Sequence, residues 1–119
     1  MPFGSPVQSA VKSVSGTSAT TLAFPSPVTS GNLLLAAYAV YDPTPDTGEL
    51  GTPTDTATTT YALVDARVIF NTGGGANRER LNLYYGVAPG GGANTVSFAW
   101  TNGAGTLGTV FIAEFAGNH

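Results

Sequence analysis

The chain has 119 residues, no cysteine, 9% charged residues and a formal net charge of −3. Its length suffices for one domain whose core needs no disulfide or metal, and the lack of cysteine excludes zinc–thiolate sites and thiol catalysis. Its four basic residues are too few for a surface that binds nucleic acid or an anionic membrane, so we expect neither partner.

Strand-sized apolar runs alternate with turn clusters along the chain, which predicts an all-β protein. The composition includes 16 glycines and 8 prolines, and we find no sustained 3.6-residue apolar repeat. We expect a single β-sandwich over residues 1–119, with about seven or eight mostly antiparallel strands in a jelly-roll or immunoglobulin-like topology. The predicted strands are residues 7–14, 20–24, 31–41, 58–70, 80–87, 94–100 and 106–116.

The third of these segments, residues 31–41, is the most informative. Leu33, Leu35 and Ala37 alternate with Leu34 and Ala36, and the pattern continues to Tyr41, so both faces of the strand are apolar. A surface helix or an edge strand would show a polar side. This pattern predicts a central strand, covered on one side by a second sheet and on the other by neighbours or a partner.

Later segments predict further features of the sheets. In residues 94–100, Val96, Phe98 and Trp100 are expected to face the core, with Ser97 and Ala99 on the opposite side. In residues 58–70 one alternating set becomes polar midway, which predicts a strand that exposes one face at its centre. The pentapeptide Gly-Gly-Gly-Ala-Asn occurs at 73–77 and at 90–94, and we interpret both copies as turns.

The segment between two of these strands, residues 42–56, is expected to be an acidic loop. Its carboxylates are Asp42, Asp46, Glu49 and Asp55. Such a group can supply the oxygen ligands that calcium takes, but the spacing fits no established calcium motif and three prolines stiffen the loop. A solvated acidic loop is the simpler interpretation, so we expect no metal and no cofactor.

Catalytic residue types are scarce. His119, the only histidine, is the last residue of the sequence, where a base is poorly held. Glu114 and Asp65 could form a glycosidase-like carboxylate pair if burial raised the pKa of Glu114. The simpler expectation is that Glu114 points outward near a strand end or pairs with Arg67 or Arg80. We therefore expect a protein that is not an enzyme.

Aromatic residues offer the remaining candidate for a binding surface. Tyr84 and Tyr85 are adjacent, so a strand sends one ring to each face. With Tyr38, Tyr41 and Trp100 an exposed ring would give a flat platform for a partner or for the stacking of sugar rings. The simpler expectation is that Trp100 packs in the core.

Several segments together resemble all-β domains of secreted bacterial proteins and phage structural proteins. The resemblance rests on Val7-Gln8-Ser9, Gly31-Asn32-Leu33-Leu34-Leu35, Thr54-Asp55-Thr56 before Tyr61-Ala62-Leu63-Val64, Leu83-Tyr84-Tyr85-Gly86, Asn94-Thr95-Val96-Ser97-Phe98 and Ile112-Ala113-Glu114-Phe115-Ala116-Gly117. Here Thr58-Thr59-Thr60 replaces the group's usual Gly-Asn-Thr, which predicts a differently shaped turn. The resemblance implies an adhesive, display or virion-surface module and carries no shared active site.

The function we expect is structural: a phage virion-surface subunit, such as a capsid decoration or head-fibre protein. It would form a homo-oligomer, such as a trimer, on a capsid or other protein lattice. The first residues lack a signal peptide, which suits assembly in a host cytoplasm, and the low charge suits close subunit contacts. The alternatives are an extracellular glycan-binding or adhesion module and an extracellular fibre subunit that donates residues 1–24 to a neighbour.

Overall fold

The computed structural model describes residues 4–42, 50–70, 78–100 and 107–117, which form eight strands and no helix. The strands are β1 (Gln8–Ser15), β2 (Ala19–Ala23), β3 (Leu33–Asp42), β4 (Thr54–Asp55), β5 (Ala62–Phe70), β6 (Arg78–Val87), β7 (Thr95–Ala99) and β8 (Leu107–Phe115). The predicted all-β class and β-sandwich are therefore confirmed. Within the described residues there is accordingly no helix that is long and apolar enough to cross a membrane.

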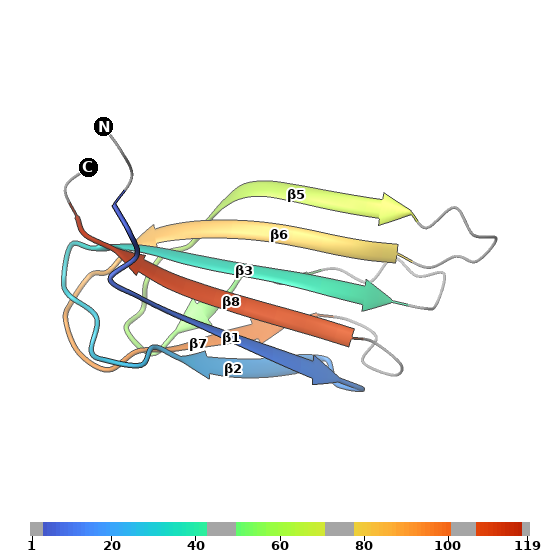
Figure 1. Ribbon diagram of the computed structural model, residues 1–119, viewed down its shortest axis with the longest axis horizontal. Coiled ribbons are helices and arrows are strands. Elements are labelled where there is room, and N and C mark those ends of the chain that lie inside the picture. Colours follow the sequence, from blue (N-terminus) through green and yellow to red (C-terminus); the bar gives the residue numbers. More distant parts are fainter. Residues whose placement is uncertain (1–3, 43–49, 71–77, 101–106, 118–119) are drawn as a thin grey trace.

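Two antiparallel sheets face each other, a larger one of order β1-β8-β3-β6-β5 and a smaller one of order β2-β7-β4 (Figure 1). Strands far apart in the sequence are neighbours: β1 pairs with β8, β2 with β7, and β3 with β6. In an immunoglobulin sandwich the first two strands share a sheet, whereas β1 and β2 lie in different sheets here. The nested pairing is that of a jelly roll, except that β5 lies at the edge of the larger sheet.

Strand β3 is the middle strand of the larger sheet, with β8 on one side and β6 on the other. Its even-numbered residues from Leu34 to Val40 are buried against the smaller sheet, while its odd-numbered residues from Leu33 to Tyr41 point outward and are half-buried. The two apolar faces of this segment therefore predicted its central position correctly.

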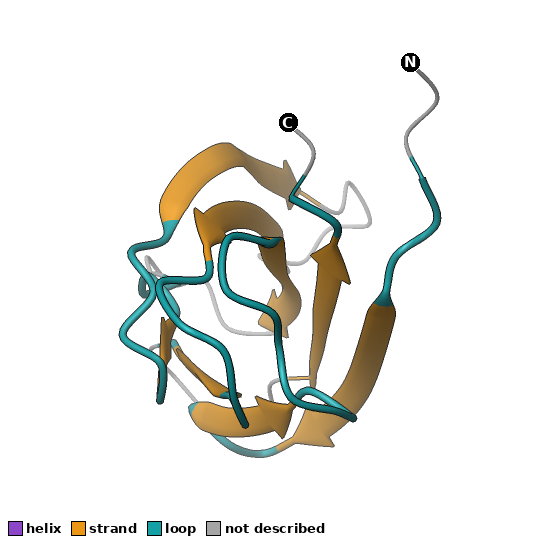
Figure 2. Ribbon diagram, turned by 90° about the vertical axis from the view of Figure 1, so that its left-hand side faces the viewer, coloured by secondary structure: helices purple, strands orange, loops and turns teal. Residues whose placement is uncertain are grey.

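The end-on view shows the two sheets facing each other (Figure 2), and the buried side chains of the core lie between them. Strand β7 contributes Val96 and Phe98, and the adjacent Trp100 is buried with them, while Ser97 and Ala99 are exposed on the opposite side. The predicted alternation of residues 94–100 is thus confirmed. From the other sheet Leu34, Tyr38, Val110 and Ile112 complete the centre of the core.

Strand β5 differs from the expectation for residues 58–70. It begins only at Ala62, because Thr58 has a positive φ of 61° and a turn precedes the strand. The register with β6 shifts between Leu63 and Asp65, so a bulge interrupts the simple alternation. Leu63 and Val64 are both 53% exposed, because β5 is an edge strand and the shorter smaller sheet leaves it partly uncovered.

The segment expected to be a loop, residues 42–56, also contains structure. Thr54–Asp55 forms the short strand β4, which pairs with β7 at Ser97 and Val96. Leu50 makes an isolated bridge to Trp100. Two residues are too short for any alternation to be read in the sequence, so this strand was not predictable from periodicity.

Candidate functional site

The five predicted aromatic residues do not form one surface. Tyr38, Tyr84 and Trp100 lie on the inner face of the sandwich and are buried. Tyr41 and Tyr85 lie on the outside of the larger sheet, where Tyr41 is half-buried and Tyr85 is exposed. Neither Tyr85 nor Tyr41 has a second exposed ring beside it among those five residues, so the expected stacking platform is absent from this set.

The buried rings instead form an aromatic centre for the core. The Tyr38 ring centroid lies 6.2 Å from that of Tyr84, 5.3 Å from Phe98 and 6.3 Å from Trp100. The Tyr38 hydroxyl donates a hydrogen bond to the carbonyl oxygen of Gly51. Burial raises the pKa of Tyr38, with a further contribution from Tyr84, so this hydroxyl stays protonated and serves packing.

The strongest candidate site is the outer face of the larger sheet, meaning the side that points away from the smaller sheet. The register places five residues in each central row of this face: Val11, Phe111, Ala37, Leu83 and Asp65 in one row, and Ser13, Thr109, Ala39, Leu81 and Arg67 in the next. Ala37 is therefore at the middle of the face, on the third of five strands.

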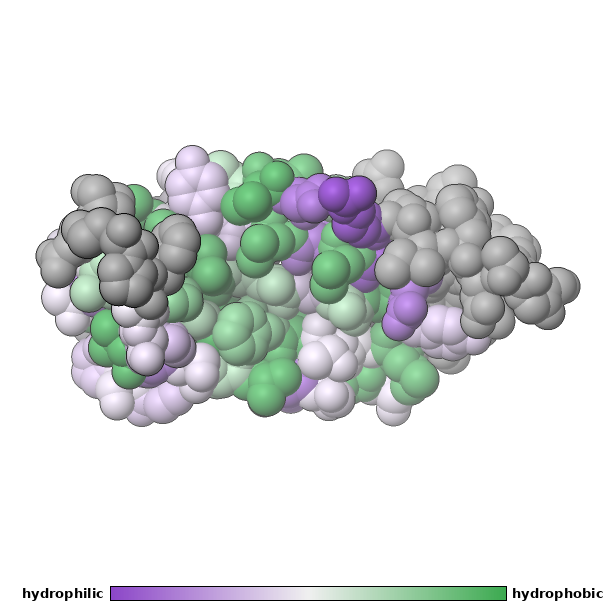
Figure 3. Space-filling model, turned by 45° about the horizontal axis from the view of Figure 1, so that its top comes forward, coloured by the Kyte–Doolittle hydropathy of each residue, from purple (hydrophilic) through white to green (hydrophobic). Residues whose placement is uncertain are grey.

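Large apolar side chains on this face are open to solvent. Six of them are between 39% and 65% exposed, namely Val11, Leu81, Tyr85, Val87, Leu107 and Phe111. Smaller residues lie between them on β3 and β8, including Ala37, Ala39 and Ala113. Figure 3 shows hydrophobic side chains gathered across the middle of the face. Soluble proteins rarely expose an apolar area of several hundred square ångströms unless it makes contacts.

Charged side chains on the outer face lie toward one edge. Asp65 and Arg67 project from β5, and Arg67 Nε lies 3.0 Å from Asp65 Oδ2. Glu79 projects from β6, opposite Tyr41. Asp65 and Arg67 thus neutralise each other. The described part of the face on β1, β8 and β3 carries no charged side chain that could select a partner of opposite charge.

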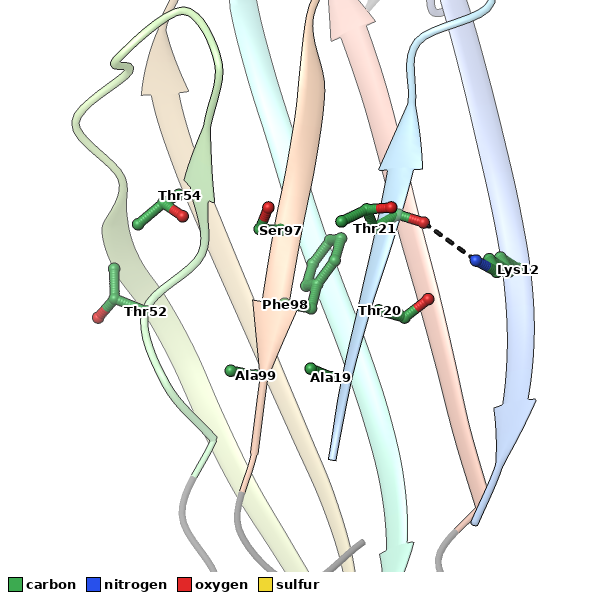
Figure 4. A pocket seen from close by; sticks show the side chains of 9 residues that line it. All are labelled: Lys12, Ala19, Thr20, Thr21, Thr52, Thr54, Ser97, Phe98 and Ala99. Carbon is green, nitrogen blue, oxygen red and sulfur yellow. Dashed lines mark hydrogen bonds between the residues drawn. The ribbon is translucent and has the colours of Figure 1, made fainter. Parts of the chain in front are cut away.

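A shallow groove of about 630 Å³ lies on the opposite surface, over the smaller sheet (Figure 4). A row of hydroxyl groups crosses it, because Ser97 on β7 pairs with Thr21 on β2 and with Thr54 on β4. Lys12 closes one side, with its ammonium 3.2 Å from the Thr21 carbonyl oxygen. Among the described residues that line the groove, Phe98 is the one with a ring, and it is buried. These residues therefore offer no exposed ring on which a sugar would stack.

Glu114 is fully buried, contrary to the expected outward position or pairing with an arginine. Gln8 Nε2 and Asn32 Nδ2 donate hydrogen bonds of 2.5 and 2.7 Å to its oxygens, and the Thr29 amide donates one of 2.8 Å. Burial alone would raise the pKa of Glu114, but the hydrogen bonds from Gln8, Thr29 and Asn32 outweigh it and lower that pKa. A carboxylate held ionised by three donors is a poor general acid. It ties β8 to β1 through Gln8 and to the loop before β3 through Thr29 and Asn32.

Asp55 is the centre of a second polar cluster. It accepts hydrogen bonds from the Thr59 amide at 2.8 Å and from Tyr61 Oη and Asn94 Nδ2 at 2.9 Å each. Burial opposes its ionisation, but the hydrogen bonds from Asn94, Thr59 and Tyr61 lower its pKa. These donors occupy the carboxylate that the acidic-loop hypothesis offered to calcium. Asp46 and Glu49, the other candidate ligands, lie outside the described residues, as does the Asp42 side chain.

No group of three or more potential metal-ligating residues occurs in the part of the chain that the structure describes. The second Gly-Gly-Gly-Ala-Asn segment lies in the connection between β6 and β7. Gly92 has a φ of 126° and pairs with Val28 in an isolated antiparallel bridge, so the segment is a loop joined to Val28 and not the simple turn that was expected. Its last residue, Asn94, is buried and bound to Asp55. The first copy, residues 73–77, and His119 lie outside the described residues.

Comparison with protein-family models, with curated proteins and with solved structures gave no match for this chain.

Proposed function

We propose that this protein is a non-enzymatic structural subunit that acts through protein–protein contacts made by the outer face of its larger sheet. The observation that carries the proposal is the exposure of Val11, Leu81 and Phe111, which lie in two neighbouring rows of a five-stranded face. The described charges of this face lie on β5 and β6, away from these side chains. The core on the inner side is complete without them, since a second sheet covers it. Exposed apolar side chains that do not serve the core are typical of an interaction surface.

A protein partner fits this face better than a small ligand does. Small-molecule sites are concave and surround a few convergent polar groups, whereas this face is the side of a sheet with central alanines at Ala37 and Ala39. The hydroxyl groove on the other surface is concave but shallow, and its one ring is buried. The exposed residues of the outer face are therefore suited to contacts with a protein over a broad apolar area.

The setting we propose is a phage virion surface, where the subunit would decorate a capsid or form part of a head fibre. The support for this setting is the resemblance of the sequence to β domains of phage structural proteins, together with the low charge of the contact face. The fibre alternative assigns residues 1–24 to a neighbouring subunit. In the folded chain, however, β1 pairs with β8 of the same molecule along all eight residues from Gln8 to Ser15.

The proposal is tested with a variant in which Val11, Leu81 and Phe111 are all changed to Thr, a residue that suits exposed strand positions. Solution mass and hydrophobic-dye fluorescence are measured together. If another copy covers the outer face of the wild type, its solution mass exceeds 12.0 kDa. If the face is open, the wild type binds the dye. The triple variant should have the monomer mass and should not bind the dye. A wild-type chain that stays monomeric and binds no dye would contradict the proposal.

A further inference from the structure

We propose that the outer face of the larger sheet packs against the same face of a second copy of this chain, forming a two-fold symmetric, face-to-face dimer. This inference rests on the proposed function and names its partner. A symmetric dimer uses the same patch on both subunits, so the patch must be complementary to itself. The composition and size of this face meet that requirement.

Charge is the first argument for a second copy. A specific contact with a different protein commonly uses complementary charges to select the partner. The described outer face has only Asp65, Arg67 and Glu79, all on β5 and β6, and the first two pair with each other. Its remaining residues are apolar or carry hydroxyl groups, such as Ser13 and Thr109, which share a 3.2 Å hydrogen bond. Two such surfaces can meet without burying unpaired charges near the centre.

Area is the second argument. Five strands about 4.8 Å apart and about 3.3 Å per residue along nine-residue strands give a face of roughly 700 Å². Stable protein pairs bury on the order of 600–1,000 Å² on each partner, so one face of this size suffices for a dimer. Small residues at its middle, Ala37 and Ala39, let two sheets approach to the usual separation of about 10 Å.

The absence of cysteine from the sequence allows a direct distance test on the full chain. A spin label attached through Ser97→Cys lies on the exposed side of the smaller sheet, away from the proposed contact. In a face-to-face dimer three sheet-to-sheet spacings of about 10 Å separate the two labelled sheets. Pulsed electron paramagnetic resonance should therefore give a label-to-label distance of about 30 Å or more. A contact through the smaller sheets would bring the labels within about 20 Å and would overturn the inference.

A lysine placed at the centre of the outer face should disrupt the proposed dimer. Whatever the direction of a two-fold axis through the middle of the contact, Ala37 of one copy faces the same region of the other. Ala37→Lys should weaken dimerisation by on the order of 100-fold, because it buries unpaired charges in the interface. Phe111→Lys, at an exposed neighbouring position, provides a second variant if the first fails to fold. Ser97→Lys, with the same charge change on the opposite surface, should leave the dimer intact.

The outcomes separate this inference from the proposed function. Dimers with distant labels that dissociate in Ala37→Lys or Phe111→Lys would support it. Dimers that persist in those variants, as an edge-to-edge pair through β1 would, overturn it. A wild-type monomer at all concentrations also overturns it. If that monomer binds hydrophobic dye and the triple threonine variant does not, contact with a different protein remains and the proposed function stands; without dye binding, both fail.

Discussion

The Tyr61 hydroxyl donates a 2.9 Å hydrogen bond to Asp55 Oδ2, which ties the start of β5 in the larger sheet to β4 in the smaller one. The chain crosses between the sheets in the intervening turn, where Thr58 has a φ of 61°. The Thr59 amide and Asn94 Nδ2 bind the same carboxylate. Asp55 thus holds together a turn, a strand and a loop that hydrophobic contact alone would leave less defined.

Changing Tyr61 to Phe removes one donor to this carboxylate and keeps the ring in place. We expect the free energy of unfolding to fall by about 1.5–3 kcal/mol, the range for hydrogen bonds to charged groups. Urea titration at neutral pH measures the change. Tyr85→Phe is the matched control, since Tyr85 is exposed and should lose almost nothing. Equal losses in the two variants would refute a structural role for the bond to Asp55.

Glu114 should be more sensitive than an exposed glutamate. In Glu114→Gln an amide group replaces one acceptor oxygen and meets donors from Gln8, Thr29 and Asn32. We expect a loss of about 1.5–3 kcal/mol in unfolding free energy. Glu79→Gln, at an exposed position of β6, should change stability by less than about 0.5 kcal/mol. If Glu114→Gln left the free energy of unfolding unchanged, the three donors would not depend on the carboxylate, and the prediction would be wrong.

Stability should fall in acid. The pKa values of Asp55 and Glu114 are lowered in the folded state, whereas in the unfolded chain they are close to the ordinary values of about 4. The unfolded chain therefore takes up protons first as the pH drops. The stabilisation is complete at neutral pH, decreases below about pH 5 and is lost once the pH passes below the folded-state pKa values. Urea titrations of the wild type between pH 7 and pH 2 should show this decrease, and Glu114→Gln should make it shallower.

Alanine substitutions at two glycines, Gly86 and Gly90, should have opposite effects on stability. A Cβ at Gly86 would lie 2.5 Å from Thr59 Cγ2 and 2.8 Å from the Thr60 carbonyl oxygen, whereas one at Gly90 meets nothing within 4 Å. Gly86→Ala should therefore cost about 1–3 kcal/mol through overpacking. Gly90→Ala should be neutral or stabilise by a few tenths of a kcal/mol, because it restricts the unfolded chain. Thermal melting of both variants checks the difference, and equal melting temperatures would contradict it.

Local periodicity was sufficient to predict the fold class, the central position of β3 and the inward-facing side of β7. Residues 31–41 are apolar on both faces because one side of β3 packs into the core and the other side lies at the middle of the apolar outer face. Residues 94–100 alternate because only one side of β7 faces the core. The apolar outer face was detectable for the same reason, since its residues on β3 form the second apolar set of that segment.

The polar clusters were not predictable, because their partners are distant in the sequence. Gln8 and Glu114 are 106 residues apart, and Asp55 and Asn94 are 39 apart, so no local pattern joins them. The expected arginine partners of Glu114 followed from charge alone, which gives no information on neighbours in space. The bulge at Leu63 and Asp65 likewise depends on pairing with β6. The burial of Tyr38 and Tyr84 depends on which side of each strand faces the smaller sheet.

The central claim is that the outer face of the larger sheet is the contact surface of this protein. The most direct test is the mass of the wild type and of the triple variant Val11→Thr, Leu81→Thr and Phe111→Thr, measured by light scattering over a wide concentration range. The account predicts that the wild-type mass rises above 12.0 kDa with concentration, while the folded triple variant stays at the monomer mass. A triple variant that associates as the wild type does would contradict it, because the contact would then use another surface.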